Sequence, residues 1–176
     1  MTADMNRGPA LSIVKRIEMM CDFIENPAIQ TAVVQAVPVT MPRLPGALGF
    51  DIPLWVGLGL VGFWAALDGF SERADLPSRK CPICKARCMP AQFAAQCLDS
   101  DSRSLGELED LRHLYAHNYA GEADDQYFAR PRHVLKRDVS IDLTCGARFD
   151  GRRPWLDLPH LRNYSQTVQR VLGRFG

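Results

Sequence analysis

Apolar residues recur every three or four positions near the start of the chain, which is the spacing of one face of an α-helix. This pattern predicts a helix over residues 10–25 that ends at Asn26 and Pro27, followed by a second helical piece over residues 28–37. The apolar positions of the first helix are Leu11, Val14, Ile17, Cys21 and Ile24. Four prolines and two glycines in residues 37–53 then predict a loop.

The most apolar stretch is "IPLWVGLGLVGFWAAL", an uncharged run of 16 residues between Asp51 and Asp68. It is shorter than the roughly 20 residues that span a bilayer, and it contains Pro53 and three glycines. We therefore expect a buried helix over residues 53–70 at the centre of a helical bundle, and no membrane association. Its glycines match G-x-G-x-x-G, but no strand precedes them, so close helix packing explains them better than a dinucleotide site.

Residues 71–103 are polar and contain cysteines, which predicts a loop insertion with a short helix over residues 90–98. Ser104 and Glu107 then have the S-x-x-E spacing of a capping box, so a helix is expected to begin there and to stop at Gly121. Its apolar stripe consists of Leu105, Leu108, Leu111, Leu114, Tyr115 and Tyr119.

Apolar residues alternate with polar ones from Val139 to Cys145, and Asp150-Gly151 offers a tight turn. This pattern predicts a small β-hairpin over residues 139–156. A last helix is expected over residues 158–175, with Asp157 as its cap and Pro159 in its first turn. Its apolar face consists of Leu161, Tyr164, Val168, Val171, Leu172 and Phe175.

Together these elements predict an all-α fold, a bundle of four to five main helices with a small β-hairpin insertion before the last helix. A length of 176 residues and 47% hydrophobic residues fit one domain over residues 1–176 with a buried core.

Charge is unevenly distributed along the chain, although the formal net charge is only +1. Residues 126–176 hold ten Lys or Arg and four Asp or Glu, a charge of +6, which leaves −5 for residues 1–125. A basic C-terminal part can contact a polyanion, but a solvated basic surface is the simpler explanation.

The N-terminal residues, "MTADMNRGPALS", lack the basic and apolar regions of a secretory signal, so we expect a cytoplasmic protein. Its six cysteines are then reduced or metal-bound rather than bridged. A zinc site is the metal alternative, because a C-x-x-C turn brings two thiolates to one tetrahedral ion; buried, reduced cysteines with no cofactor are the simpler interpretation. The candidate ligands are Cys81, Cys84, Cys88 and Cys97.

The segment "LRHLYAHN", residues 111–118, concentrates two of the four histidines within an apparent leucine-faced helix. His113 and His117 are four residues apart, but without an acidic residue between them a metal pair is not favoured. Arg112 and His117 are five apart, about 140° around an ideal helix, so one helix does not direct both at one point. Two copies packed about a two-fold axis would bring two arginines and two histidines into one cleft.

Such a cleft would suit RNA chemistry, in which histidine exchanges protons with ribose oxygens and arginine stabilises charge on the phosphate. The alternative is structural: Arg112 and His113 lie on the surface, while His117 and Asn118 satisfy buried backbone groups.

The run Arg112, His113, three further residues and His117-Asn118 resembles the R-x(4–6)-H motif of the HEPN superfamily (higher eukaryotes and prokaryotes nucleotide-binding). The resemblance implies a metal-independent endoribonuclease, often a toxin or defence effector, that acts as a homodimer with both motifs at the interface. Arg112 would then contact the scissile phosphate and His117 would transfer protons, with His113 and Asn118 in support. Its partners would be RNA, a second copy and an antitoxin or neighbouring regulatory protein.

The basic C-terminal part adds Arg148, Arg152 and Arg153 as candidate RNA contacts. The family also contains members that bind without cutting. A non-catalytic HEPN-like or zinc-stabilised module that docks a protein or nucleotide partner therefore remains the second hypothesis.

Overall fold

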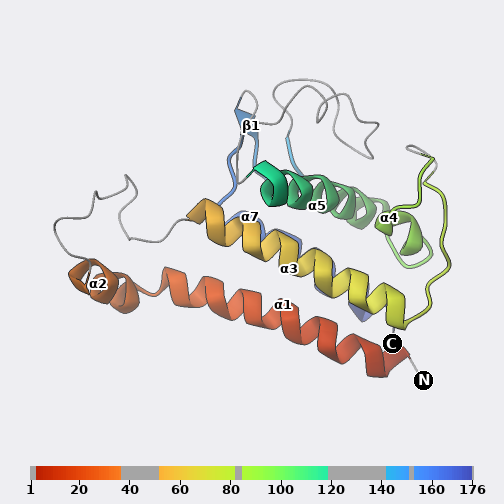
Figure 1. The fold of residues 1–176 in the computed structure, drawn as a ribbon, viewed down its shortest axis with the longest axis horizontal. Coiled ribbons are helices and arrows are strands. Elements are labelled where there is room, and N and C mark those ends of the chain that lie inside the picture. The colour runs from red at the N-terminus through yellow and green to blue at the C-terminus, as the bar shows by residue number, and fades with distance from the viewer. Residues whose placement is uncertain (1–2, 37–51, 82–84, 119–141, 151–152, 176) are drawn as a thin grey trace.

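The computed structural model describes residues 3–36, 52–81, 85–118, 142–150 and 153–175, and these ranges are predominantly helical (Figure 1). The helices are α1 (Ala3–Glu25), α2 (Pro27–Ala36), α3 (Ile52–Arg73), α4 (Met89–Gln92), α5 (Asp99–Asn118) and α7 (Leu158–Gly173). The all-α class is thereby confirmed.

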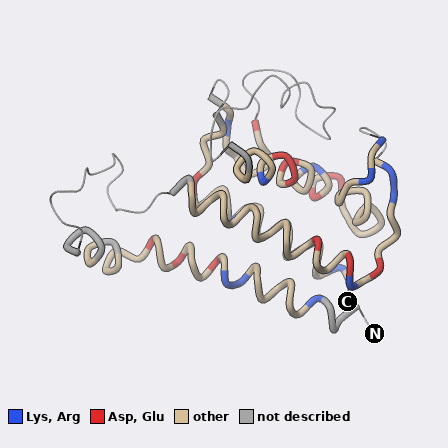
Figure 2. Tube along the Cα trace, in the orientation of Figure 1, with Lys and Arg blue, Asp and Glu red and all other residues tan. Residues whose placement is uncertain are grey.

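The central element is α3, which packs against α1, α5 and α7 (Figure 1). Helix α7 also contacts α1 and α5, so that these four helices enclose one core, while α2 extends from the end of α1. By length and composition alone, residues 54–73 of α3 are apolar enough to cross a membrane, and half of this stretch is buried inside the protein. Figure 2 shows that the charged residues of α3 are confined to its C-terminal end.

The G-x-G-x-x-G glycines serve helix packing, as the sequence indicated. A Cβ atom on Gly57 would lie 2.9 Å from Tyr115 of α5, and one on Gly59 would lie 2.5 Å from Leu161 of α7. A Cβ on Gly62 would lie 2.7 Å from Ile17 of α1. The three glycines therefore let three different helices approach α3 closely.

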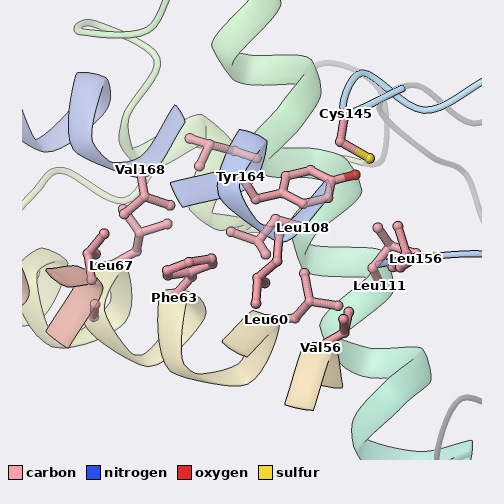
Figure 3. Close-up of a cluster of buried hydrophobic side chains, with 14 of the residues drawn as sticks. Val56, Leu60, Phe63, Leu67, Leu108, Leu111, Cys145, Leu156, Tyr164 and Val168 are labelled. Atoms are coloured by element: carbon pink, nitrogen blue, oxygen red, sulfur yellow. The ribbon is translucent and has the colours of Figure 1, made fainter. Parts of the chain in front are cut away.

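The core is formed by apolar side chains from all four helices. Figure 3 shows part of it, with residues of α3, α5 and α7 among those labelled. Leu60 and Phe63 of α3 have no exposed surface, and they meet Leu108 of α5 and Tyr164 of α7 in the same cluster. Burying a side chain of this size contributes roughly 1.5–3 kcal/mol relative to leaving it exposed. Packing of this kind, rather than local propensity, stabilises α3.

The last helix begins where the sequence predicted. Asp157 is the N-cap residue of α7, and its side chain forms a capping box with His160, whose Nδ1 accepts the Asp157 backbone N–H at 3.0 Å. The helix ends at Gly173. The predicted apolar face is buried at Leu161, Tyr164, Val168, Val171 and Leu172, and Phe175 is partly buried against the core.

The predicted start of the helix that carries "LRHLYAHN" is wrong by five residues, because α5 begins at Asp99. Ser104 is not its cap: the hydroxyl lies 3.1 Å from the Ser100 carbonyl oxygen, one turn earlier, as happens inside a helix. Asp99 and Asp101 occupy the first turn, where negative charge favours the helix dipole. The predicted stop at Gly121 lies outside the described residues.

The cysteine-containing insertion is correspondingly shorter than the predicted residues 71–103, since α3 continues to Arg73 and α5 begins at Asp99. Among the described residues between them, Met89–Gln92 form the one helix, in place of the predicted 90–98. Phe93 ties this segment to the core by edge-on contact with Phe175, at 5.6 Å between ring centres. Similarly, α1 begins at Ala3 rather than residue 10, with Pro9 inside the helix.

Two short strands, β1 (Phe149–Asp150) and β2 (Arg153–Pro154), pair antiparallel with Phe149 opposite Pro154. They lie within the segment for which a hairpin was predicted. Residues 139–141 and 151–152 are outside the described ranges, so a hairpin over the full 139–156 stays a prediction. The loop predicted for residues 37–53 falls almost wholly outside them too.

Candidate functional site

The R-x-x-x-x-H segment belongs to one continuous helix, because α5 runs to Asn118. The backbone of His117 and Asn118 is helical, and their side chains lie outside what the structure describes. With Arg112 and His117 on one helix, about 140° separates their directions around its axis. A single copy of α5 therefore does not direct both side chains at one point.

Arg112 is half-buried and lies against Trp64 of α3, with its guanidinium carbon 4.9 Å from the ring centre. This is a cation–π contact, in which the negative face of the indole attracts the positive guanidinium group. The Nε atom of Arg112 is buried and has no hydrogen-bond partner among the described residues. The contact with Trp64 thus positions the guanidinium group without engaging this donor.

Glu109 lies one turn before Arg112 on the same side of α5. Burial and the nearby Asp110 charge raise the pKa of Glu109 to about 7, although the Arg112 charge lowers it in part. Its Oε2 atom is buried and has no hydrogen-bond partner among the residues that are described. A carboxyl group that titrates near neutral pH therefore lies beside the candidate arginine. His113, half-buried, follows four residues later on that side.

A second, fully buried carboxyl group, Glu107, connects α5 to the 142–148 segment and α7. Its carboxylate accepts hydrogen bonds from the Thr144 backbone N–H at 2.9 Å, from the Thr144 hydroxyl, and from the Tyr164 hydroxyl at 3.1 Å. Burial raises the pKa of Glu107, while these hydrogen bonds act in the opposite direction. Figure 3 shows the Tyr164 hydroxyl directed toward Cys145, the residue after Thr144.

A cavity of about 180 Å³ lies beside this network, between α5, α7 and the 142–148 segment, and it does not include Arg112. Its lining residues are Ser100, Ser104, Thr144, Cys145, Asn163, Tyr164, Gln166, Thr167 and Arg170. The hydroxyl-rich wall is therefore separate from the arginine and histidine positions that the sequence singled out.

The arginines of the basic C-terminal part pair with carboxylates where the structure describes them. Arg148, a candidate RNA contact, lies 2.6 Å from Asp142, and both side chains are largely exposed. Arg152 lies outside the described residues, and for Arg153 the structure describes the backbone in β2 but not the side chain. Exposed pairs of this kind are weak, so the Arg148 pairing does not prevent an exchange for a phosphate.

Three further arginines of this part neutralise acidic residues from the first 125. Arg162 lies 2.8 Å from Asp22 and 2.6 Å from Glu25 of α1. Arg170 and Arg174 both pair with Asp101, at 3.1 and 2.8 Å. Part of the positive charge of residues 126–176 is therefore paired, between helices, with negative charge from residues 1–125.

The four cysteines considered for zinc fall into different surroundings. Cys81 and Cys88 share a small buried cluster with Ala91, whereas Cys97 packs against the main core. Cys84 lies outside the described residues. Within the described ranges, no group of three or more His, Cys, Asp or Glu residues could hold a metal ion.

The sequence did not single out Glu109 or Trp64, and it indicated Glu107 only as part of a capping box. A signal existed for Glu107: it falls on the same helical stripe as Leu111 and Leu114, where an acidic residue must be buried and needs partners. No sequence signal paired Trp64 with Arg112, because the two residues lie on different helices. The chain matches no family model, and neither a curated protein nor a solved structure was found to be similar to it.

Proposed function

We propose that the protein is a metal-independent endoribonuclease of the HEPN type, which acts as a homodimer with a composite site of Arg112 and His117 from both copies. A basic surface that includes Arg148, Arg152 and Arg153 would guide single-stranded or looped RNA to this site. The observation that supports it best is the contact of Arg112 with Trp64, which positions a guanidinium group on the same helix as His117.

Each step of the reaction uses groups of this chain. His117 takes the proton of a ribose 2′-hydroxyl, and the 2′-oxygen attacks the adjacent phosphorus atom. The bond from phosphorus to the 5′-oxygen breaks, and this oxygen takes a proton from the second copy's histidine. The products are a 2′,3′-cyclic phosphate, which water opens to a 3′-phosphate, and a 5′-hydroxyl.

Arg112 stabilises the negative charge that develops on the phosphate oxygens in this reaction. Preorganised cations are effective here because they need no reorganisation as the charge grows. The indole of Trp64 limits the positions that the guanidinium group can adopt, which reduces the entropy lost on binding RNA. His113 and Asn118 flank the two main residues as supporting polar groups. An antitoxin or neighbouring regulatory protein would restrain the activity in the cell.

The experiment is cleavage of end-labelled RNA in EDTA by the wild type, Arg112→Ala and His117→Ala proteins. Arg103→Ala is the matched control, since Arg103 is an exposed arginine on the same helix. We expect cleavage by the wild type and the control alone, with 2′,3′-cyclic or 3′-phosphate ends. Size-exclusion chromatography with light scattering checks that each variant is a folded dimer. Equal cleavage by Arg112→Ala would contradict the proposal.

The proximity of Cys81 and Cys88 supports a second candidate function, a zinc-stabilised binding module. A hydrogen bond closes a turn between the described residues on either side of 82–84: the Cys81 N–H donates to the Ala86 carbonyl oxygen at 2.8 Å, and Lys85 has a left-handed φ of 58°. Such a turn brings the two ends of the C-x-x-C-x-x-x-C segment together. Stoichiometric zinc in the purified protein, lost in Cys81→Ser together with the thermal stability, would favour this module.

A further inference from the structure

Glu109 and Arg112 are neighbouring side chains on α5, and each retains a buried hydrogen-bonding atom that no described residue uses. They lie three residues apart on α5, where side chains are neighbours. Each has one buried polar atom, Glu109 Oε2 and Arg112 Nε, that finds no hydrogen-bond partner in the described part of the chain. A buried polar atom without a partner is costly, so this arrangement stabilises the fold less than a closed ion pair would.

Among the described residues, Arg112 is the one cation whose charge affects the pKa of Glu109. Asp110 is the other charged group whose field Glu109 experiences, and His113 is the next titratable residue along this side of α5. Of the helices packed against α5, α4 contains no ionisable residue.

The described ionisable residues of α3 are exposed, and those of α7 bond to groups other than Glu109. The latter include His160, which accepts the Asp157 N–H, and Arg162, which pairs with Asp22 and Glu25. On α3, Asp68, Glu72 and Arg73 are exposed. On α7, Tyr164 bonds to Glu107 and Arg170 bonds to Asp101, both on α5 but away from Glu109. The balance between Glu109 and Arg112 therefore depends on few other charges.

We infer that Glu109 is a positioning residue for the proposed ribonuclease site: as a carboxylate it retains the Arg112 guanidinium group, and as a neutral acid it releases that group to an RNA phosphate. This inference rests on the proposed function. A phosphate and a carboxylate compete for the same cation, so the charge state of Glu109 sets how strongly Arg112 binds RNA. The raised pKa of Glu109 places this exchange near neutral pH.

Thermodynamic linkage gives the inference a measurable consequence. An RNA phosphate brought to Arg112 adds negative charge near Glu109 and therefore favours its protonated form. RNA binding is then coupled to the uptake of a proton, and the affinity falls as the pH rises above 7, by at most tenfold per pH unit for one proton.

The binding experiment uses a fluorescent single-stranded oligonucleotide with 2′-O-methyl riboses, which lack the nucleophile, in EDTA at constant ionic strength from pH 5.5 to 8.5. We expect the wild-type affinity to fall about five- to tenfold between pH 6 and pH 8. Glu109→Gln removes most of this dependence and binds at pH 8 as the wild type does at pH 6. His113→Gln retains the difference, which separates Glu109 from a histidine titration. Identical pH profiles for the wild type and Glu109→Gln overturn the inference.

A measurement on the protein alone separates this inference from the proposed function. The indole N–H resonance of Trp64, assigned by its loss in Trp64→Phe, reports on the guanidinium group above the ring. We expect it to titrate near pH 7 in the wild type and not in Glu109→Gln. Titration without RNA binding at any pH would reject the proposed function and retain the Glu109–Arg112 coupling. A Trp64 resonance that does not change with pH, or that titrates equally in Glu109→Gln, rejects the Glu109–Arg112 coupling.

Discussion

The guanidinium carbon of Arg112 lies 4.9 Å from the centre of the Trp64 ring, so α3 holds the arginine that α5 contributes to the proposed site. A cation–π contact of this kind contributes about 0.5–2 kcal/mol, depending on how far it is desolvated. We expect Trp64→Leu to lower the RNA cleavage rate about tenfold, because the guanidinium group loses its fixed position.

The matched control for this prediction is Trp64→Phe, which keeps an aromatic face below Arg112 and should retain most of the activity. Thermal unfolding of both variants separates loss of position from loss of fold. Full activity in Trp64→Leu would show that the contact only packs the helices.

Close packing at Gly59 should make any side chain there costly. A Cβ atom would lie 2.5 Å from the Cδ2 atom of Leu161, a residue that is 1% exposed and has little room to move. We expect Gly59→Ala to lower the free energy of unfolding by about 1–3 kcal/mol, as overpacked cores do. Urea denaturation at equilibrium measures the change.

Gly69→Ala is the control for Gly59→Ala, because Gly69 also lies inside α3 but its Cβ position has only the flexible end of the Arg73 side chain nearby, at 3.4 Å. Alanine there should stabilise the protein by about 0.5–1 kcal/mol through helix propensity. Equal effects of the two substitutions would contradict the packing explanation.

Glu109 should make stability depend on pH in the direction opposite to an ordinary salt-bridged acid. Its folded-state pKa of about 7 lies above the usual 4.5, so between these values the folded protein keeps a proton that the unfolded chain has lost. Stability from this group therefore falls as the pH rises from 4.5 to 7. After allowance for solvent screening, we expect Glu109→Gln to gain about 1–2 kcal/mol over the wild type at pH 8.

The advantage of Glu109→Gln should be nearly gone at pH 4.5, where the wild-type carboxyl group is protonated in the folded state and half protonated in the unfolded chain. Thermal unfolding of both proteins at several pH values gives the comparison. An advantage that is the same at pH 4.5 and pH 8 would show that the gain does not arise from ionisation.

The Glu107 network should be sensitive to the loss of a single hydroxyl group. Tyr164→Phe removes the donor that lies 3.1 Å from Glu107 Oε2 and leaves the buried carboxyl group with fewer partners. We expect a cost of about 1–2 kcal/mol in the free energy of unfolding. Tyr115→Phe is the control, because the Tyr115 hydroxyl has no hydrogen-bond partner among the described residues; the cost there should be close to zero. Equal costs would argue against the network.

The sequence determined the helices whose signals are local. Asp157 and Pro159 marked the start of α7, Pro27 marked the boundary of α1 and α2, and the apolar run from Ile52 identified the core helix. These predictions held because capping groups and the fixed φ of proline act within a few residues of where they occur.

Tertiary structure decided what depends on residues distant along the chain. Ser104 and Glu107 matched a capping box by spacing. In the structure, however, both side chains bond to Thr144, and Glu107 also accepts a hydrogen bond from Tyr164. The basic C-terminal charge was visible in the sequence, but only the fold pairs Arg162 with Asp22 and Glu25.

For the candidate site, the sequence placed Arg112 and His117 on one helix, and the structure has α5 continuous through both. It did not reveal that Trp64 lies beneath Arg112 or that burial near Arg112 raises the pKa of Glu109. Helical periodicity determines which residues of one helix share a face. The side chain that a second helix packs against that face, and how much water it excludes, are properties of the assembled core alone.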